Sequence, residues 1–228
     1  IEGAERDGAA TGRFGATSTT DDPEGEVAES GATIDEAALR AALPAFVGEL
    51  TQIPPAASAV HVDGERAYRR FRRGEEVAVP ARQVLVHELE LLDFDDATQT
   101  AELDVSCGPG TYIRSIARDL GETLGTGAYL TALRRTEVGR FDVADAAAPD
   151  AIADAPPGTL GWQSPLAAIP QLPHRGLTPE ERIAIGHGRR IANDGLDGDV
   201  ALVDDAVLVA IGNATGPEIA PQLVLEPA

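Results

Sequence analysis

The stretch from residue 82 to residue 125 restricts the fold of this chain more than any other part of the sequence. Residues 82–94 are rich in Val and Leu and predict a long strand, and residues 99–107 alternate apolar and polar side chains as a neighbouring strand does. After a sharp turn at residues 108–110, an apolar stripe from Ile113 to Leu124 has helical spacing. The Asp-rich segment between the two strands predicts a hairpin loop, so the strands are expected to pair as antiparallel neighbours, with a helix following them.

Weaker patterns assign the rest of the chain. An apolar residue at every third or fourth position predicts a helix over about residues 34–46, and residues 129–135 predict another short helix. Pro54-Pro55 excludes a helix and favours an extended segment. From residue 190 onward, short β-rich runs separated by Gly, Asp and Asn predict a small β domain.

These patterns divide the chain into four segments. Residues 1–12 have no periodicity and no bulky apolar residue after Ile1, which predicts an atypical or disordered end. Residues 13–150 are expected to form one domain and residues 171–228 a second, smaller one. Residues 151–170 are rich in Ala and Pro and predict a linker between them.

Composition excludes several classes of protein. The 228 residues hold no run of about 18 apolar residues that could span a membrane. The single cysteine can form neither an internal disulfide nor a cysteine-based zinc site, and the four histidines lack ligand spacing. We therefore expect a cytoplasmic protein without a metal. We also expect it to act as a monomer.

The charge distribution bears on the partner. A net charge of −20 argues against nucleic acid when it is taken over the whole chain. However, residues 61–140 hold 11 of the 18 arginines, and five of these lie within residues 66–73 (RAYRRFRR) beside two aromatic residues. Such a cluster either contacts phosphates and stacks on bases or forms a solvated helix face.

Several segments resemble, in their order and spacing, the bacterial tRNA pseudouridine synthase B (TruB) family. They are RFGATSTTDDPEGEV (13–27), FVGELTQIPPAASAV (46–60), GERAY (64–68), RG (73–74), CGPGTYIR (107–114), DLG (119–121), LG (124–125), LRR (133–135) and VGRF (138–141). The match covers roughly residues 13–228.

The resemblance implies a fold and a reaction. The implied fold is α+β: a pseudouridine synthase core with a mixed, largely antiparallel sheet and flanking helices, followed by a small PUA-like β domain that binds RNA. The enzyme is an isomerase that converts uridine 55 in the T-arm of tRNA to pseudouridine, without metal or organic cofactor. The base is flipped out of its loop and an aspartate carboxylate is the covalent catalyst.

The resemblance also implies roles for individual residues. Arg114 would pair with the catalytic aspartate and keep it ionised, Tyr112 would line the same pocket, and Leu133 would pack near the base. The alternatives are a surface salt bridge for Arg114 and core packing for Tyr112 and Leu133. The arginines expected to bind the substrate are Arg66, Arg69, Arg70, Arg72, Arg73, Arg134 and Arg135.

One part of the family pattern is absent. The nucleophile of the family lies in a Gly-x-Leu-Asp-Pro motif upstream of the segment that starts here at Arg13, and that motif does not occur in these residues. Asp21 and Asp22 precede a proline as the motif does, but their neighbours match a later family segment, and Asp beside Pro and Gly is typical of turns. A tyrosine of the family corresponds to Gly8. We therefore expect an N-terminally incomplete synthase that has no turnover by itself.

Two functions of other classes remain open. A non-catalytic protein that holds tRNA, or assists its folding, would share the RNA surface and lack the chemistry. An acidic protein-interaction domain would not bind RNA, and steeply salt-dependent tRNA binding would exclude it. Cys107 is expected to be a small buried residue rather than a nucleophile.

Overall fold

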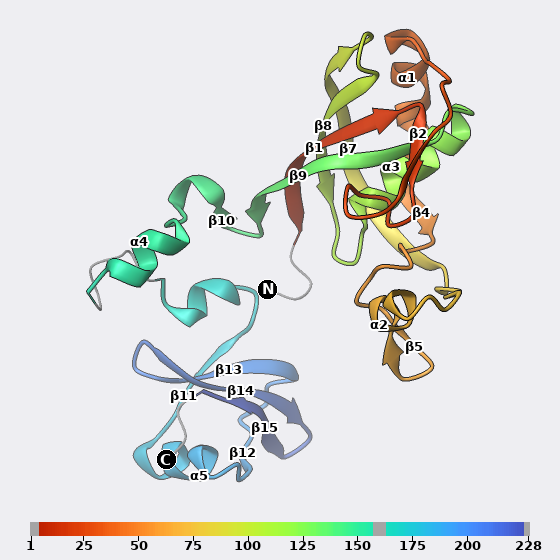
Figure 1. The fold of residues 1–228 in the computed structure, drawn as a ribbon. Helices are drawn as coiled ribbons and strands as arrows, with labels where there is room; N and C mark the ends of the chain where they lie inside the picture. Colours follow the sequence, from red (N-terminus) through yellow and green to blue (C-terminus); the bar gives the residue numbers. More distant parts are fainter. Residues whose placement is uncertain (1–4, 157–162, 226–228) are drawn as a thin grey trace. The chain divides into compact units, whose positions relative to one another are not determined.

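The computed structural model describes residues 5–156 and 163–225, and the chain divides into two compact units, Glu2–Ala146 and Ala147–Ala228 (Figure 1). The larger unit combines an antiparallel sheet with helices, and the smaller one is built mainly from strands. This arrangement confirms the α+β class and the separate β-rich C-terminal part.

The larger unit is organised around a six-stranded sheet. Its strands are β1 (Arg6–Phe14), β4 (Gly48–Gln52), β7 (Arg82–Asp95), β8 (Thr100–Cys107), β9 (Ala128–Val138) and β10 (Phe141–Asp142). The order is β10-β9-β1-β8-β7-β4, and all neighbouring strands are antiparallel. Two additional two-stranded sheets pair β2 (Ala16–Ser18) with β3 (Val27–Glu29) and β5 (His61–Val62) with β6 (Glu65–Arg66).

Helices complete this unit. They are α1 (Glu36–Ala42) with the 3-10 turn η1 (Leu43–Phe46), α2 (Ala67–Arg72), α3 (Ile113–Thr123) and the 3-10 turn η2 (Val143–Asp145). The predicted stripe of α3 is buried, with Ile116 and Leu120 almost inaccessible to solvent, and it belongs to the same core as the inner side chains of β7 and β8. Burying each such side chain contributes about 1.5–3 kcal/mol of transfer free energy, so this contact fixes α3 against the sheet.

Two predictions for this unit were wrong. Residues 6–12, expected to be disordered, belong to β1, which lies between β8 and β9 in the middle of the sheet. Most side chains of this stretch are too small to give an apolar signal. The strand forms nevertheless, because backbone hydrogen bonds hold it on both edges. Residues 129–135, expected to be helical, lie in β9, since pairing with β1 outweighs the local helix pattern.

The smaller unit is a five-stranded sheet with one covering helix. Its strands are β11 (His174–Gly176), β12 (Ile191–Ala192), β13 (Gly198–Asp204), β14 (Val207–Thr215) and β15 (Glu218–Val224), in the order β11-β13-β14-β15-β12. The helices are α4 (Pro149–Asp154), the 3-10 turn η3 (Pro165–Ala168) and α5 (Pro179–Gly186).

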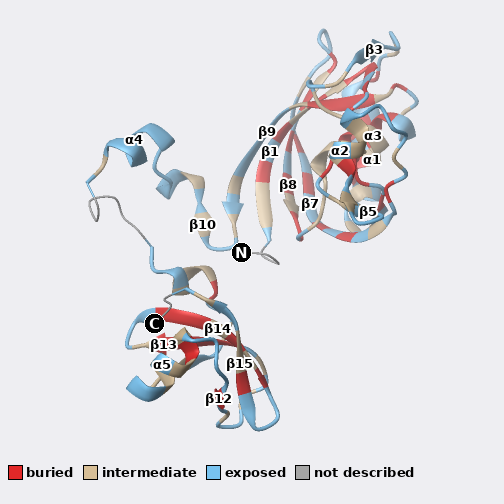
Figure 2. Ribbon diagram, turned by 60° about the horizontal axis from the view of Figure 1, so that its bottom comes forward, coloured by how far each residue is buried: buried red, intermediate tan, exposed pale blue. Residues whose placement is uncertain are grey.

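The predicted linker is partly built into the smaller unit. Ile169 is buried with side chains of β13 and β14, and Leu166 of η3 packs against the same cluster, whereas α4 buries no residue (Figure 2). The segment 151–170 is therefore not a free linker along its whole length. Residues 157–162 of the predicted linker lie outside the described residues.

A partly buried ion pair anchors α5. Arg175 of β11 donates to both carboxylate oxygens of Glu181 at 2.5 and 2.7 Å, and Glu181 also closes a capping box with Thr178. The hydrogen bonds from Arg175 lower the pKa of Glu181 from 4.5 to about 2. Because the folded-state pKa is depressed, this stabilisation is complete above pH 4.5 and is lost as the pH falls toward 2.

Replacing Glu181 by Gln is expected to lower the unfolding free energy of the smaller unit by about 1–3 kcal/mol at pH 7 and by much less at pH 2.5. The measurement is urea unfolding followed through the amide signals of β13 and β14 at both pH values. Glu180→Gln, on the same helical turn and without an ion pair among the described residues, is the matched control. Equal losses at the two pH values would contradict the prediction.

Candidate active site

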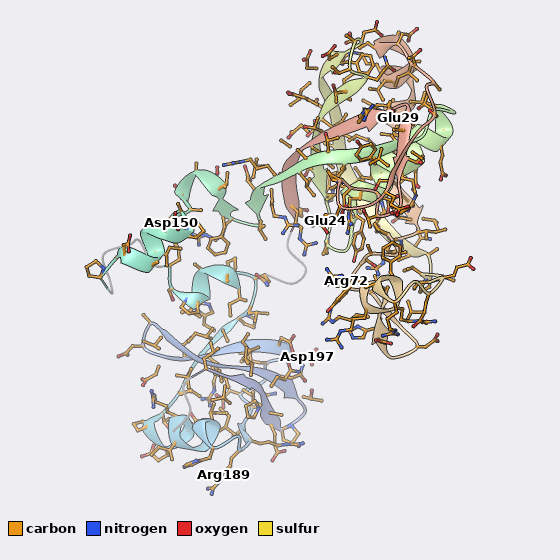
Figure 3. All side chains as sticks on the ribbon, viewed as in Figure 1. Glu24, Glu29, Arg72, Asp150, Arg189 and Asp197 are labelled. Carbon is orange, nitrogen blue, oxygen red and sulfur yellow. The ribbon has the colours of Figure 1, made fainter. Side chains whose placement is uncertain are left out.

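A cavity of about 710 Å³ opens where four segments of the larger unit meet, a size suited to a single nucleotide or another small ligand. We call it the site cavity. Glu24 and Arg72, both labelled in Figure 3, belong to two of its walls. Its lining residues are Thr20, Asp22, Glu24, Ala57, Ser58, Ala59, Tyr68, Phe71, Arg72, Tyr112 and Arg114.

Arg114, on the first turn of α3, is fixed at the wall of this cavity. Its Nη1 donates to Asp22 Oδ2 at 2.5 Å and to the carbonyl of Thr20 at 3.0 Å, and its Nη2 donates to the carbonyl of Ala57 at 3.1 Å. The side chain is only 22% exposed. The sequence-based alternative of a surface salt bridge therefore does not describe Arg114, which joins three segments of the chain.

Asp22 is held as firmly as its arginine. Besides the contact with Arg114, its Oδ1 accepts from the Thr20 hydroxyl at 2.6 Å and from the backbone N–H of Glu24 at 3.1 Å. Three donors thus orient one carboxylate toward a guanidinium at the edge of the cavity. The structure therefore gives Asp22 a role beyond turn formation, as the partner of Arg114.

Asp21, the neighbour of Asp22, has a different partner. Its Oδ2 lies 2.9 Å from Nη1 of Arg118, one helical turn after Arg114 on α3. Burial raises the pKa of Asp21, and the charge of Arg118 opposes that rise. Neither Asp21 nor Arg118 lines the site cavity.

Tyr112 lines the cavity, as predicted for a residue at the junction between strand and helix. The side-chain amide of Gln52 holds its backbone from both sides, accepting from the Tyr112 N–H at 2.8 Å and donating to its carbonyl at 3.1 Å. The guanidinium of Arg82 lies 5.5 Å from the ring centroid of Tyr112, within the range of a cation–π contact.

The structure divides the arginine cluster of residues 66–73. Arg70 is ion-paired with Asp63 and Glu75, and Arg73 with Glu65 and Glu75. These two guanidinium groups are therefore largely neutralised by neighbouring carboxylates.

The other three arginines have no carboxylate partner among the described residues. Arg69 and Arg72 lie at 6.0 and 5.7 Å from the ring centroid of Tyr68, and Arg72 and Tyr68 both line the site cavity. Arg66 is exposed and donates to a backbone carbonyl. These three guanidinium groups remain available to an anionic ligand.

Leu133 is not among the residues that line the site cavity. It lies on β9 with an exposed fraction of 52% and lines a second, smaller cavity together with Gly8, Cys107 and Arg135. A Cβ atom at Gly8 would lie 2.9 Å from the carbonyl oxygen of Arg134, so the close approach of β1 and β9 favours glycine there. Arg134 and Arg135 are both exposed on β9.

Other chemistries find little support in the described residues. Cys107 is buried, and burial raises the pKa of its thiol, which disfavours a nucleophilic thiolate. No group of three or more His, Cys, Asp or Glu side chains is placed to hold a metal ion in residues 5–156 and 163–225. Among those same residues, no helix combines the length and apolar character that crossing a bilayer requires.

Sequence reasoning missed Gln52, Arg82 and Arg118 as supports of the site. Gln52 is almost fully buried although it follows an exposed threonine, and nothing in the local pattern distinguishes it from a surface glutamine. Arg82 starts β7, far along the chain from the ring that it covers. These contacts are made only after the chain has folded.

Comparisons with known sequences place the chain beside one family. The family model described as TruB family pseudouridylate synthase (N terminal domain) matches residues 1–113, and that of the tRNA pseudouridylate synthase B C-terminal domain matches residues 114–156. The chain is 42% identical over 224 residues to tRNA pseudouridine synthase B of Corynebacterium aurimucosum, covering 96% of the chain and 75% of that protein. The enzyme of the same name from Thermobifida fusca is 44% identical over 217 residues, covering 91% of the chain and 73% of that protein.

Solved structures show the same fold. The chain superposes on a chain of a Cbf5-Nop10-Gar1 complex with a TM-score of 0.67 at 21% identity, covering 100% of the chain and 68% of that chain. A chain of the archaeal box H/ACA sRNP Nop10-Cbf5 complex gives a TM-score of 0.67 at 20% identity with the same coverage. At this level of identity the likeness concerns the fold alone.

Proposed function

The chain belongs to the TruB family of pseudouridylate synthases, which are isomerases, and on that premise we propose that it serves the conversion of uridine to pseudouridine at position 55 in the T-arm of tRNA. The observation that carries the proposal is the arrangement of Arg114 in the site cavity, which its fixed guanidinium lines together with aromatic residues. Such a cavity suits a flipped uracil ring, which needs stacking surfaces and polar contacts at its edge.

Arg114 can orient a second carboxylate. A guanidinium has five N–H donors, and the three hydrogen bonds to Asp22, Thr20 and Ala57 use three of them. Nε–H and one N–H of Nη2 remain without a partner among the described residues. A catalytic aspartate can accept from these donors and stay ionised, as a nucleophile requires.

The isomerisation needs that aspartate. The carboxylate assists cleavage of the bond between ribose C1′ and N1 of uracil, the ring turns within the cavity, and a new bond forms from C1′ to C5, from which a proton is lost. The Gly-x-Leu-Asp-Pro motif that carries the nucleophile in the family does not occur in the 228 residues. In this proposal the chain supplies the arginine, the stacking rings and the RNA surface.

Each aromatic and basic residue has a place in this proposal. Tyr112, Tyr68 and Phe71 stack on or enclose the base. The arginines of the 66–73 cluster that have no carboxylate partner among the described residues contact phosphates. The larger unit would form the catalytic domain and the smaller unit a PUA-like RNA-binding domain, in a monomeric cytoplasmic protein. Leu133, Arg134 and Arg135 would contact RNA from β9.

The proposal is tested with a T-arm stem–loop that carries tritium at C5 of uridine 55. A protein of these 228 residues is expected to bind this RNA with an affinity that falls steeply with salt, and to release no tritium. An anticodon-arm stem–loop of equal length is the control and is expected to bind more weakly. Equal binding of the two stem–loops would contradict T-arm specificity, and the absence of binding to either would contradict the RNA function.

Tritium release would have a different consequence. It would show that a carboxylate within these residues is the nucleophile, and Asp22 and Asp21 would be the first to replace. Binding of the T-arm without release leaves a non-catalytic tRNA-binding protein as the alternative. Joining the family's aspartate segment to residue 1 then separates the two, because only a synthase gains turnover.

A further inference from the structure

Two consecutive aspartates contact two arginines that lie one helical turn apart. Asp22 pairs with Arg114 and Asp21 with Arg118, both on α3. The aspartates belong to the turn that joins β2 to β3, which we call the site turn (residues 19–26) and which lies beside α3 (Figure 1). One turn of backbone is thus held to one helix by two parallel ion pairs.

This double contact depends on an unusual backbone conformation. In an extended segment, consecutive side chains point in opposite directions, so two neighbouring aspartates could not both reach one helix. Asp21 has a φ of +60°, in the left-handed region that few residues other than Gly, Asn and Asp adopt. The turn of the chain at Asp21 brings both carboxylates onto α3.

Arg118 joins three segments. Besides Asp21, it contacts Asp119 on its own helix at 2.8 Å, and its Nη2 donates to the carbonyl of Ile53 at 2.8 Å. Ile53 belongs to the extended segment that continues to Ala57, the residue whose carbonyl accepts from Arg114. Arg118 therefore links α3 to the same two segments as Arg114 does, but outside the site cavity.

We propose that Asp21 and Arg118 form a positioning pair, which fixes the site turn so that Asp22 and Arg114 meet in the orientation that the site requires. The pair does not line the cavity and acts only through Asp22 and Arg114. Its catalytic meaning rests on the proposed function, whereas its effect on the conformation of Arg114 does not.

Stability does not account for this pair. Burial raises the pKa of Asp21 even with Arg118, Arg114 and Asp119 nearby. Folding therefore disfavours the charged form of Asp21. The contribution of this carboxyl group to the unfolding free energy is full below its unfolded-state pKa and is lost as the pH rises through its folded-state pKa. At neutral pH, Asn in place of Asp21 is expected to change the unfolding free energy little, because Arg118 keeps its contacts with Asp119 and with the carbonyl of Ile53.

Asp21→Asn is the direct test, because Asn accepts the left-handed conformation and lacks the charge. The readout is the NMR spectrum of the Arg114 guanidinium, assigned by its loss in Arg114→Lys. In the native chain, the hydrogen bonds on both Nη atoms are expected to restrict rotation and to give separate Nη–H signals. In Asp21→Asn these signals are expected to average, with an unfolding midpoint in urea within about 10% of the native value.

Asp119→Asn is the matched control. It removes the other carboxylate that contacts Arg118, on the helix rather than on the site turn, and is expected to leave the Arg114 signals separate. Asp21→Gly adopts the same backbone conformation without any side chain and should reproduce Asp21→Asn. Separate Arg114 signals in both Asp21 variants would overturn the proposal, because the pair would then have no positioning role. A large fall in the unfolding midpoints of these variants would also overturn it and would assign the pair a structural role.

These readouts use no RNA. Failure of the T-arm stem–loop to bind would contradict the proposed function and leave the positioning pair intact. Binding of the stem–loop together with unchanged Arg114 signals in the Asp21 variants would contradict the pair and leave the function intact.

Discussion

Replacing Arg114 by Ala is expected to lower tritium release from uridine 55 by about a thousandfold or more. The measurement uses a fusion in which the aspartate segment of a family member precedes residue 1 of the chain. The substitution removes the donors that orient the catalytic carboxylate and leaves Asp22 without the guanidinium that it contacts at 2.5 Å. An unpaired carboxylate at the wall of the cavity would also repel the incoming aspartate. Affinity for the stem–loop is expected to change less than about threefold, because most of it comes from phosphate contacts.

The control for this experiment is Arg40→Ala. Arg40 is also ion-paired, with Glu36 at 2.7 Å, but it lies on α1 and does not line the site cavity. Its turnover is expected to equal that of the unmodified chain. An Arg114→Ala rate within a few-fold of that value would contradict the role of Arg114 in turnover. A loss of stem–loop affinity as large as the loss of rate would instead assign Arg114 to RNA binding.

The second large effect concerns the arginine cluster. Replacing Arg69 and Arg72 together by Ala is expected to weaken binding of the T-arm stem–loop about ten- to a hundredfold at 0.1 M salt and to reduce the slope of log K against log salt by about 1 per arginine. Both guanidinium groups lie against Tyr68 without a carboxylate partner among the described residues. The measurement is the affinity at several salt concentrations.

The same cluster provides the matched control. Replacing Arg70 and Arg73 removes the same number of charges from the same segment, but these two are already paired with Asp63, Glu65 and Glu75. We expect a change in slope below about 0.5, because a paired guanidinium releases few counterions from RNA. Equal losses of affinity in the two double variants would contradict the division between paired and available arginines. No loss of affinity in either variant would show that the cluster is a solvated helix face.

Local sequence predicted the elements that bury an apolar stripe. The spacing from Ile113 to Leu124 predicted α3, and the alternation in residues 99–107 predicted β8, because burial of one face imposes a period on the chain. β1 buries every second residue from Gly8 onward, but those positions are Gly or Ala until Phe14, and such small residues give no apolar signal. The places of β1 and β9 in the sheet depend on backbone pairing with partners far along the chain, which a local pattern does not report.

The candidate site was predictable only in part. The order of motifs assigned Arg114 and Tyr112 to one pocket, and the structure places both at the site cavity. The resemblance also assigned Leu133 to the surroundings of the base, and the structure places it on β9, where it lines the smaller cavity and not the site cavity. Motif order carries the identity of residues, whereas the face to which a side chain points depends on the type of element that holds it.

By itself, the sequence determined the family and the α+β class, and it assigned an arginine and a tyrosine to one pocket. Only the tertiary structure decided which charges are free. The five arginines of residues 66–73 cannot be told apart in the sequence. Folding brings Asp63, Glu65 and Glu75 to two of them and leaves three without a carboxylate partner among the described residues. In the same way, Asp21 and Asp22 read as a turn, and the left-handed conformation at Asp21 gives each its own arginine. Ion pairing depends on distances of a few ångströms between groups far apart in sequence, and the fold alone sets those distances.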